Sequence, residues 1–409
     1  MNNDYKVLRE LGHKLAEIAN LPVQQEKKAL WTANNDLHAE RPMVYVDQLP
    51  WFELNTAEEM KLQCEDPFLR TVEQDIRMLL YRWNHFRCDM VVENWIELPR
   101  TIHGLNYGIH IKEETLQTNA ANDIVSHSYM DQLEDEDALN ALQNDVITVD
   151  EELDQRRMDL CNDIFNGIIP VRFGGVPIHA GLWDRIAQMR PAENILYGFA
   201  DEPEFTAQIV QKFVDLTNST IDQCERLGLL DPQMQYVHCT GAYTNDLPTD
   251  GMEDGKAKAR NCWAFGMAQI LSTVSPAMHE EYEIDICKPM YERFGLLYYG
   301  CCEPLHNKID MVRKVKNIRK ISCSPWCDID IAADNIAGDY VFSCKSNPAF
   351  ICGGDFHEDD IRKQLSSAKE ACRRTNTPLE IILKDVSSLN GHLDYVDRWE
   401  KIAMEYALG

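Results

Sequence analysis

The chain has 409 residues, of which 44% are hydrophobic and 26% are charged, and its net charge is −27. This acidity excludes nucleic acid as an expected partner, because phosphate binding needs clustered Lys and Arg. No apolar run reaches the roughly 18–20 residues of a membrane helix, and the N-terminus lacks the basic head and cleavage site of a signal peptide. We therefore expect a cytoplasmic protein that does not contact membranes.

The first elements along the chain predict an α-helical N-terminal extension over residues 1–87. Apolar residues recur at three- and four-residue steps through residues 1–35, which predicts one amphipathic helix. Residues 41–54 are bounded by prolines and predicted to be extended, and residues 66–86 carry a second apolar helical face. We expect this extension to cover one end of the main domain.

From residue 88 onward, short apolar runs alternate with helical segments. The predicted strands are 88–98, 168–175, 235–240, 262–270, 295–301, 318–324, 339–345 and 379–385. The predicted helices are 204–228, 277–293, 304–316, 356–375 and 392–407. Eight strands in mostly alternating order favour an α/β fold, namely a (β/α)8 TIM barrel over residues 88–409. A doubly wound sheet is disfavoured, because no glycine-rich phosphate turn follows an early strand.

An acidic insertion interrupts this pattern near residues 110–165. It contains the run DQLEDEDALNALQND (131–145), which is too acidic for a core strand. We predict an exposed helix or a lid here, and a solvated helix is the simpler interpretation. No internal repeat or low-complexity linker marks a further domain.

Polar and thiol side chains follow most of the predicted strands. In chain order they are Glu93, Asn94, Arg172, His238, Cys239, Gln269, Cys301, Cys302, Glu303, Ser322, Cys323, Ser324, Lys345, Asn347, Lys384 and Asp385. In a barrel, the carboxyl ends of the strands share one face, and that face carries the active site. This convergence is hard to explain as core packing, so it favours an enzyme.

The chain holds 14 cysteines although it lacks an export signal. In a reducing cytosol they are expected to be thiols, small buried apolar residues or metal ligands, and not disulfides. Most of these cysteines lie singly in apolar runs, which indicates that they are buried in the core. Only the group around Cys301, Cys302, Cys323 and Cys327 is dense enough to indicate chemistry.

The sharpest motif is YYGCCEPLHNKID (298–310), in which a strand ends in two thiols and a carboxylate. Thiolates and carboxylates are acceptable ligands for Zn²⁺. Adjacent residues alternate sides of a strand, so one of Cys301 and Cys302 is expected to point inward. His238 or Cys239, together with Asp385, are candidates for the remaining ligands. The alternative is packed cysteines beside a capping Glu303, and both interpretations stay open.

Two further segments carry candidate site residues. The loop HCTGAYTNDLP (238–248) contains His238, Tyr243 and Asp246, which could contact substrate or transfer protons. Aromatic side chains near the mouth could pack an aryl ring, and they equally suit an ordinary core: Trp51, Phe52, Trp95, Tyr298 and Tyr299.

The motif CSPWC (323–327) does not have the two-residue gap of a redox or zinc-knuckle pair. Ser-Pro after a strand is a good helix start, with Ser324 as N-cap and Pro325 first in the helix. We therefore interpret this motif as structural.

These motifs together resemble the uroporphyrinogen-decarboxylase superfamily over most of residues 40–407. The resemblance is carried by RPMVYVDQLPW, LYRWNHFRCDMVVEN, GCCEPLHNKID, SPWCDIDIAADNIAGDYVFSCKSNPA and LKDVSSLNGHLDYVDRW. The arginine-rich N-terminal run of the true decarboxylases is absent. This departure points to the corrinoid-linked methyltransferase branch.

The methyltransferase branch holds zinc with a His-x-Cys pair and a later Cys. In this chain Cys302 matches the family Cys, Gly300 stands where the His would be, and Asp385 lies near the position of the final Cys. The resemblance therefore implies a changed ligand set, such as Cys302, Glu303 and Asp385, with Cys301 beside it.

The resemblance implies the first methyltransferase of an O-demethylase system in an anaerobic bacterium. Such an enzyme moves a methyl group from a small methylated compound, here expected to be an aryl methyl ether, to the Co(I) of a corrinoid protein. The expected catalytic residues are His238, Tyr243 and Glu303. The expected substrate-binding residues are Trp51, Glu93, Asn94, Arg172, Asp246 and Tyr298. The corrinoid is carried by the partner protein, Zn²⁺ is a candidate metal, and a homodimer is a candidate assembly.

Two other functions remain as alternatives. A decarboxylase of a small aromatic or tetrapyrrole acid predicts several inward arginines, but only Arg172 ends a strand, while Arg82, Arg87 and Arg100 flank the first one. A non-catalytic subunit that binds a corrinoid or a partner protein through the barrel mouth predicts neither metal nor turnover. The glycine at position 300 keeps that third function open.

Overall fold

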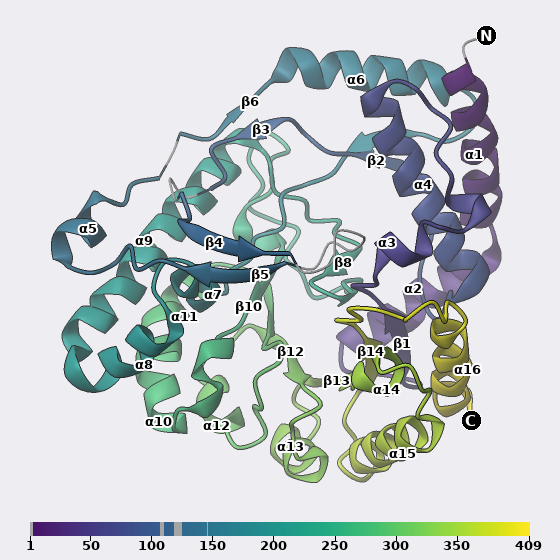
Figure 1. Cartoon of the computed structure of the whole chain (residues 1–409). Helices are drawn as coiled ribbons and strands as arrows, with labels where there is room; N and C mark the ends of the chain where they lie inside the picture. The colour runs from purple at the N-terminus through teal and green to yellow at the C-terminus, as the bar shows by residue number, and fades with distance from the viewer. Residues whose placement is uncertain (1–2, 107–109, 118–124, 145) are drawn as a thin grey trace.

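A six-stranded parallel sheet forms the centre of the molecule, for which the computed structural model describes residues 3–106, 110–117, 125–144 and 146–409 (Figure 1). The strand order is β1-β14-β13-β12-β11-β10. The strands are β1 (Met43–Val46), β10 (Trp263–Gly266), β11 (Leu296–Tyr299), β12 (Ile318–Cys323), β13 (Val341–Ser346) and β14 (Leu379–Leu383). All five ladders are parallel, so the α/β class is confirmed.

The late strands form where the sequence predicts them, because their apolar runs suit a sheet that is covered on both faces. Strands β11 and β14, with the sequences LLYY and LEIIL, are buried at every residue. Parallel sheets need such continuous apolar strands, since helices cover both of their faces. Helices α15 (Glu358–Arg374) and α16 (Tyr395–Leu408) pack against the strands at this end of the sheet.

Several predicted helices are confirmed, and others are broken or shortened. The confirmed ones are α4 (Pro67–His85), α9 (Pro203–Leu227), α15 and α16. The helix predicted over 277–293 is divided into three consecutive elements. They are α10 (Pro276–His279), the π-helical η4 (Glu280–Ile284) and α11 (Asp285–Tyr291). Other helices include α3 (Trp51–Leu54), α7 (Leu182–Ala187), α8 (Ala192–Asp201), α12 (Ile309–Val312), α13 (Ile329–Ile336) and α14 (Ala349–Cys352), with short 3₁₀ turns η1 (Glu58–Met60), η2 (Ala259–Asn261) and η3 (Gln269–Thr273).

Single backbone contacts extend the sheet beyond both edge strands. The Asp89 N–H donates to the Val44 carbonyl of β1 at 3.0 Å. At the other edge, His179 bridges Phe265 of β10, and the Ala180 N–H donates to the Phe265 carbonyl at 2.7 Å. The consecutive strand order and these two extra segments suit a curled sheet. Closure into an eight-stranded barrel stays a prediction, because the ladders of the described residues do not join the two edges.

The first three predicted strands are not members of the central sheet, so this part of the prediction is wrong. The segment 88–98 contributes only β2 (Ile96–Leu98), which pairs in parallel with β7 (Val171–Phe173). The segment 235–240 forms a hairpin of β8 (Tyr236–Val237) and β9 (Thr240–Gly241). His238 adopts a positive φ of 54° between them, which reverses the chain after two strand residues.

The N-terminal region contains two helices where the sequence predicts one over residues 1–35. Helix α1 (Asn3–Ala19) ends before helix α2 (Pro22–Asn35), and Pro22 is the first residue of α2. Proline suits a first turn but breaks a helix interior, which explains the separation. Strand β1 also lies within residues 1–87, so this region supplies a strand of the central sheet as well as helices.

The helix after β12 starts later than predicted. Residues 324–327 form a turn in which the Cys327 N–H donates to the Ser324 carbonyl at 3.0 Å. Helix α13 begins at Ile329, and its N-cap is Asp328, whose carboxylate accepts from the Ile331 N–H at 3.0 Å. The prediction of Ser324 as N-cap is wrong, because the chain offers a better cap four residues later.

A buried ion pair fastens the β8–β9 hairpin to the sheet. Lys320 of β12 and Glu380 of β14 lie 2.7 Å apart, and both side chains are completely buried. Thr240 of β9 donates to Glu380 at 2.8 Å, and Lys320 donates to the Gly241 carbonyl at 2.9 Å. The hairpin therefore crosses the inner face of the sheet and places its turn residue, His238, toward the carboxyl ends of the strands.

The acidic insertion contains a short helix and several small sheets. Helix α5 (Glu136–Ala141) falls in the acidic run, and α6 (Glu151–Ile164) follows it. The hairpin of β4 (Glu113–Leu116) and β5 (Ser126–Tyr129) projects across one side of the molecule, while β3 (Ile102–His103) pairs with β6 (Thr148–Val149) (Figure 1). Residues 118–124 and 145 of this insertion lie outside the described residues. In the described part of the chain, no helix has the length and apolar character that crossing a bilayer requires.

Candidate functional site

Two cysteines, a histidine, a lysine and an aspartate meet beyond the carboxyl ends of β11 and β14. The Cys301 and Cys302 sulfurs are 3.6 Å apart, and the Cys301 sulfur is 3.7 Å from His238 Nε2. The Cys302 thiol lies 3.6 Å from Asp385 Oδ2. Lys384 Nζ lies 2.9 Å from the Cys301 sulfur, 3.1 Å from His238 Nε2 and 3.2 Å from Asp385 Oδ2. We call these five residues the thiol–ammonium cluster.

The backbone around the cluster is held in conformations that most residues avoid. Gly300 has a φ of 92°, and a Cβ there would lie 2.5 Å from Leu305 Cδ1. His238 and Asp385 also have positive φ values, of 54° and 59°. Backbone of this kind persists only where the surrounding structure determines it, and it gathers at functional sites. The glycine at position 300 is therefore required by the turn that delivers the thiols.

Glu303 fixes the position of the thiols through the backbone. Its carboxylate accepts from the Cys301 N–H at 2.8 Å and from the Ala268 N–H at 3.0 Å, and the side chain is fully buried. The expected roles of Glu303 were metal ligand and catalytic group. The structure places both of its oxygens on backbone amides, so Glu303 orients Cys301 and joins β11 to the end of β10.

An aromatic wall lines the cluster on its inner side. The His238 ring stacks on Phe265 with centroids 3.8 Å apart and an interplanar angle of 4°. The Tyr298 ring lies 6.0 Å from His238, and its hydroxyl shares a hydrogen bond with Ser343 at 2.8 Å. Lys345 donates to the same Tyr298 hydroxyl and to Ser343. The expectation that Tyr298 lies at the site agrees with this position, whereas its contact with a substrate stays a prediction.

The two thiols share a hydrogen bond that shifts their pKa values in opposite directions. The hydrogen bond from the Cys301 thiol lowers the pKa of Cys302, and the same bond raises the pKa of Cys301. Lys384 directs an N–H at Cys301, which favours charge on that sulfur too, so the pair titrates as a unit. Burial lowers the pKa of Lys384, but Coulombic interactions with Cys239, Cys301 and Asp385 raise it above its usual value. Lys384 is therefore an ammonium.

The predicted zinc ligand set does not fit this arrangement. In the described ranges of the chain, no three His, Cys, Asp or Glu side chains are placed to hold a metal ion together. Glu303 faces backbone amides, and the Lys384 ammonium lies among the donors of Cys301, His238 and Asp385. The Lys384 ammonium therefore occupies the place among these side chains that a metal ion would need.

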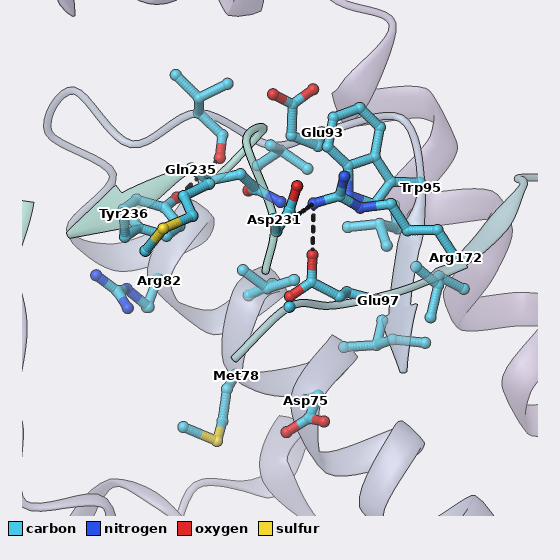
Figure 2. A pocket seen from close by; sticks show the side chains of 18 of the residues that line it. Asp75, Met78, Arg82, Glu93, Trp95, Glu97, Arg172, Asp231, Gln235 and Tyr236 are labelled. Carbon is cyan, nitrogen blue, oxygen red and sulfur yellow. Dashed lines mark hydrogen bonds and ion pairs between the residues drawn. The ribbon is translucent and has the colours of Figure 1, made fainter. Parts of the chain in front are cut away.

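A cavity of about 450 Å³ opens beside β2, β7 and β8 and contains two of the predicted substrate-binding residues, Glu93 and Arg172 (Figure 2). Arg172 bonds Glu97 at 2.7 Å and Asp231 at 2.9 Å, and its guanidinium lies 4.4 Å from the Trp95 ring centroid. Arg172 Nε and Trp95 Nε1 are buried without an acceptor among the described residues. Two carboxylates and the Trp95 ring therefore hold the Arg172 guanidinium in place.

The other predicted residues are dispersed around these two places. Tyr243 donates to Glu93 at 2.8 Å, so this hydroxyl belongs to the cavity side and not to the thiol–ammonium cluster. Asp246 pairs with Arg319 at 2.7 Å. Trp51 packs edge-on against Tyr81, with ring centroids 6.1 Å apart, and Asn94 is exposed. Of the predicted catalytic residues, only His238 lies in the cluster itself.

The sequence places Lys384 at the end of a predicted strand, but the pattern assigns no role to it. The available signal is its context, because it follows the fully apolar run of β14 and precedes the candidate ligand Asp385. A lysine at the end of a buried strand must find anionic or polar partners, since an isolated buried ammonium is costly. Its side chain is only 3% exposed.

Comparison with known proteins supports the fold. No protein-family model matches the chain. No curated protein matches it either. Among solved structures, a methyltransferase from Methanosarcina mazei superposes with a TM-score of 0.51 at 9% identity, over 93% of this chain and 98% of that chain. At this level of identity the similarity shows a shared fold across nearly the whole length of both chains.

Proposed function

We propose that the protein is a methyltransferase that takes a methyl group from a small methylated compound, with an aryl methyl ether as the expected class. The observation that carries the proposal is the thiol–ammonium cluster, which joins soft sulfur donors to a buried ammonium beyond the carboxyl ends of parallel strands. The fold shared with the Methanosarcina mazei methyltransferase supports it. Membership of the uroporphyrinogen-decarboxylase superfamily, a full (β/α)8 barrel and a cytoplasmic location belong to the same proposal.

Lys384 would stabilise the charge that develops when the methyl group leaves. Methyl transfer from an ether breaks the carbon–oxygen bond, and the electron pair remains on the oxygen. An ammonium that is 3% exposed interacts with such charge more strongly than one in water. His238 Nε2, 3.1 Å from Lys384 Nζ, lies beside the same position and helps to orient the ammonium.

Other residues of the chain would bind and orient the methyl donor. Phe265 and Tyr298 are buried behind the cluster, where the Phe265 ring stacks on His238, so they would position this imidazole toward the methyl donor. A corrinoid carried by a separate protein would supply Co(I) as the methyl acceptor. The acceptor needs an open approach, and Asp385, whose side chain is 45% exposed, marks the open side of the cluster.

The test is release of phenol from aryl methyl ethers in the presence of a reduced corrinoid protein. We expect turnover with the parent protein and a rate lower by about 100- to 1,000-fold in Lys384→Met, the loss typical when one preorganised donor is removed. Lys363→Met on the exposed face of α15 is the matched control and should keep the parent rate. Equal rates in Lys384→Met and Lys363→Met would show that Lys384 takes no part in the reaction. A complete lack of methyl transfer from the ethers tested would contradict the proposed function.

A further inference from the structure

We propose that the cavity beside β2, β7 and β8 binds a small organic amine, whose protonated nitrogen contacts Asp75 and whose hydrocarbon part fills the interior. The cavity has a volume of about 450 Å³, which is within the range of small-molecule sites. Among the described residues, its lining includes no member of the thiol–ammonium cluster. The inference therefore stands whether or not the protein transfers methyl groups.

Asp75 presents a carboxylate to the cavity that lacks a cation of the protein. It lies on α4 and lines the cavity together with Met78 of the next turn (Figure 2). Asp75 is exposed, so a ligand can reach it. Among the described residues, no hydrogen bond or ion pair reaches its carboxylate. The surrounding protein withdraws this group from water, which raises its pKa, and an ammonium beside it would replace the lost hydration.

Two of the other charged groups that line the cavity are neutralised by partners outside it. Lys28 pairs with Glu93 at 2.5 Å. The Arg82 guanidinium lies 3.8 Å from the Asp47 carboxylate and donates to the Val46 carbonyl. Because each of these pairs is neutral, the charge of the cavity depends on the groups that remain.

The remaining charged groups make the cavity negative. Arg172 forms ion pairs with Glu97 at 2.7 Å and with Asp231 at 2.9 Å, so one guanidinium serves two carboxylates. Asp75 adds a further carboxylate to the lining. The Glu97 side chain is 45% exposed, so a ligand in the cavity can sense its charge. Such a cavity attracts a cation and repels an anion.

The apolar part of the lining suits the hydrocarbon body of an amine. It includes Leu15 of α1, Met78 and Leu79 of α4, Ile96 of β2 and Met234. A bare inorganic cation gains nothing from these side chains, whereas an organic amine buries its hydrocarbon against them. The two methionines can adapt their shape to the bound molecule. The combination of apolar walls and excess carboxylates therefore selects an amine with an apolar body.

The test compares three probes that share a six-carbon chain. They are n-hexylamine, n-hexanol and hexanoate, which are cationic, neutral and anionic at pH 7. Isothermal titration calorimetry of the full chain at low salt measures their dissociation constants. We expect hexylamine to bind at one site per chain and about 10-fold more tightly than hexanol, the gain typical of one charge-assisted hydrogen bond. Hexanoate should show no binding.

Two variants locate the bound amine. Asp75→Asn removes the carboxylate and should weaken hexylamine binding by about 10-fold while hexanol binding stays unchanged. Met78→Trp fills part of the cavity without changing its charge and should weaken the binding of both probes. Asp359→Asn, at an exposed position in the first turn of α15, is the matched control for the loss of one surface charge and should bind hexylamine like the parent.

Circular dichroism reports whether the variants fold, and if one of them does not, the other decides. Hexylamine binding that is unchanged in the folded variants would place the amine elsewhere on the acidic surface and overturn the proposal. A parent protein that binds no hexylamine at a single site would overturn it too. The same conclusion would follow if hexanoate bound as tightly as hexylamine.

Discussion

At the scale of single residues, Cys327 is the thiol whose surroundings most favour the thiolate. Hydrogen bonds from the Cys323 thiol, the Leu305 backbone, His306 and Ser324 lower its pKa to about 6. The turn over residues 324–327 produces this arrangement by folding Cys327 back onto the end of β12. The sequence indicates a structural role for the motif CSPWC, and the same turn also lowers the pKa of its second thiol.

We expect Cys327 to be alkylated by iodoacetamide at pH 7 faster than the other partly exposed thiol outside the cluster, Cys352, because the thiolate is the nucleophile. Its rate should fall as the pH drops through about 6. Cys323→Ser should move that midpoint upward, since it weakens the largest stabilising contact. Peptide mass spectrometry after short labelling measures both. Equal labelling of Cys327 and Cys352 at pH 7 would contradict this assignment.

Gly300 and Gly354 differ in how much space their surroundings leave for a side chain. A Cβ at Gly300 would lie 2.5 Å from Leu305 Cδ1, whereas a Cβ at Gly354 meets no atom within 4 Å. Both glycines have nearly the same positive φ, of 92° and 93°, so an alanine is strained at either position and Gly354→Ala serves as the control for that strain. Thermal unfolding should show Gly300→Ala to be destabilised more than Gly354→Ala. Equal destabilisation would mean that Leu305 moves aside freely.

At the scale of elements, the π-helical segment η4 places an acid in the core. Glu283 lies on η4 between α10 and α11 and is fully buried. Burial raises its pKa to about 8, although the Tyr291 hydroxyl and the Cys287 thiol both donate to it. A π-helical turn changes which residues share a helix face, and such turns are frequent at functional sites. Here the turn points a carboxylic acid inward.

The raised pKa of Glu283 makes stability depend on pH. In the folded protein Glu283 keeps its proton up to about pH 8, while the unfolded chain loses it near 4.5. Its stabilising contribution is therefore complete below pH 4.5 and is lost as the pH rises through about 8, by up to about 1.4 kcal/mol per pH unit. Urea unfolding of Glu283→Gln should show a smaller fall in stability between pH 5 and 8 than the parent. The exposed neighbour variant Glu281→Gln should follow the parent, and a parallel response of all three would contradict the assignment.

The elements of the sheet differ in how well the sequence predicts them. Strands β10 to β14 and helices α9, α15 and α16 were predicted because their apolar patterns are long and local. The region 88–98 has an equally apolar sequence, but only Ile96–Leu98 forms a strand, and its partner β7 is remote in the chain. Pairing between remote segments depends on the rest of the fold, and periodicity does not contain that information.

At the scale of the whole molecule, the site was only partly predictable for the same reason. Cys301, Cys302, His238 and Asp385 were all identified from strand ends, and the structure brings them together. Glu303 was assigned as a ligand because its sequence position is adjacent to the thiols, but its carboxylate turns back to two backbone amides. The position of Lys384 beside these side chains depends on the fold, because the fold brings together three segments that are remote in sequence, around residues 238, 301 and 384.

The position of β1 in the sheet has a consequence for how the protein is made. Strand β1 is synthesised long before its only ladder partner among the described strands, which is β14. At about 5–20 residues per second, a ribosome needs roughly 20 to 70 s to reach β14 after β1 has been made. During that interval the four buried residues Met43–Val46 have no strand to pair with. The nascent chain therefore carries an unpaired apolar segment until β14 has been synthesised, and during that time this segment is exposed to aggregation.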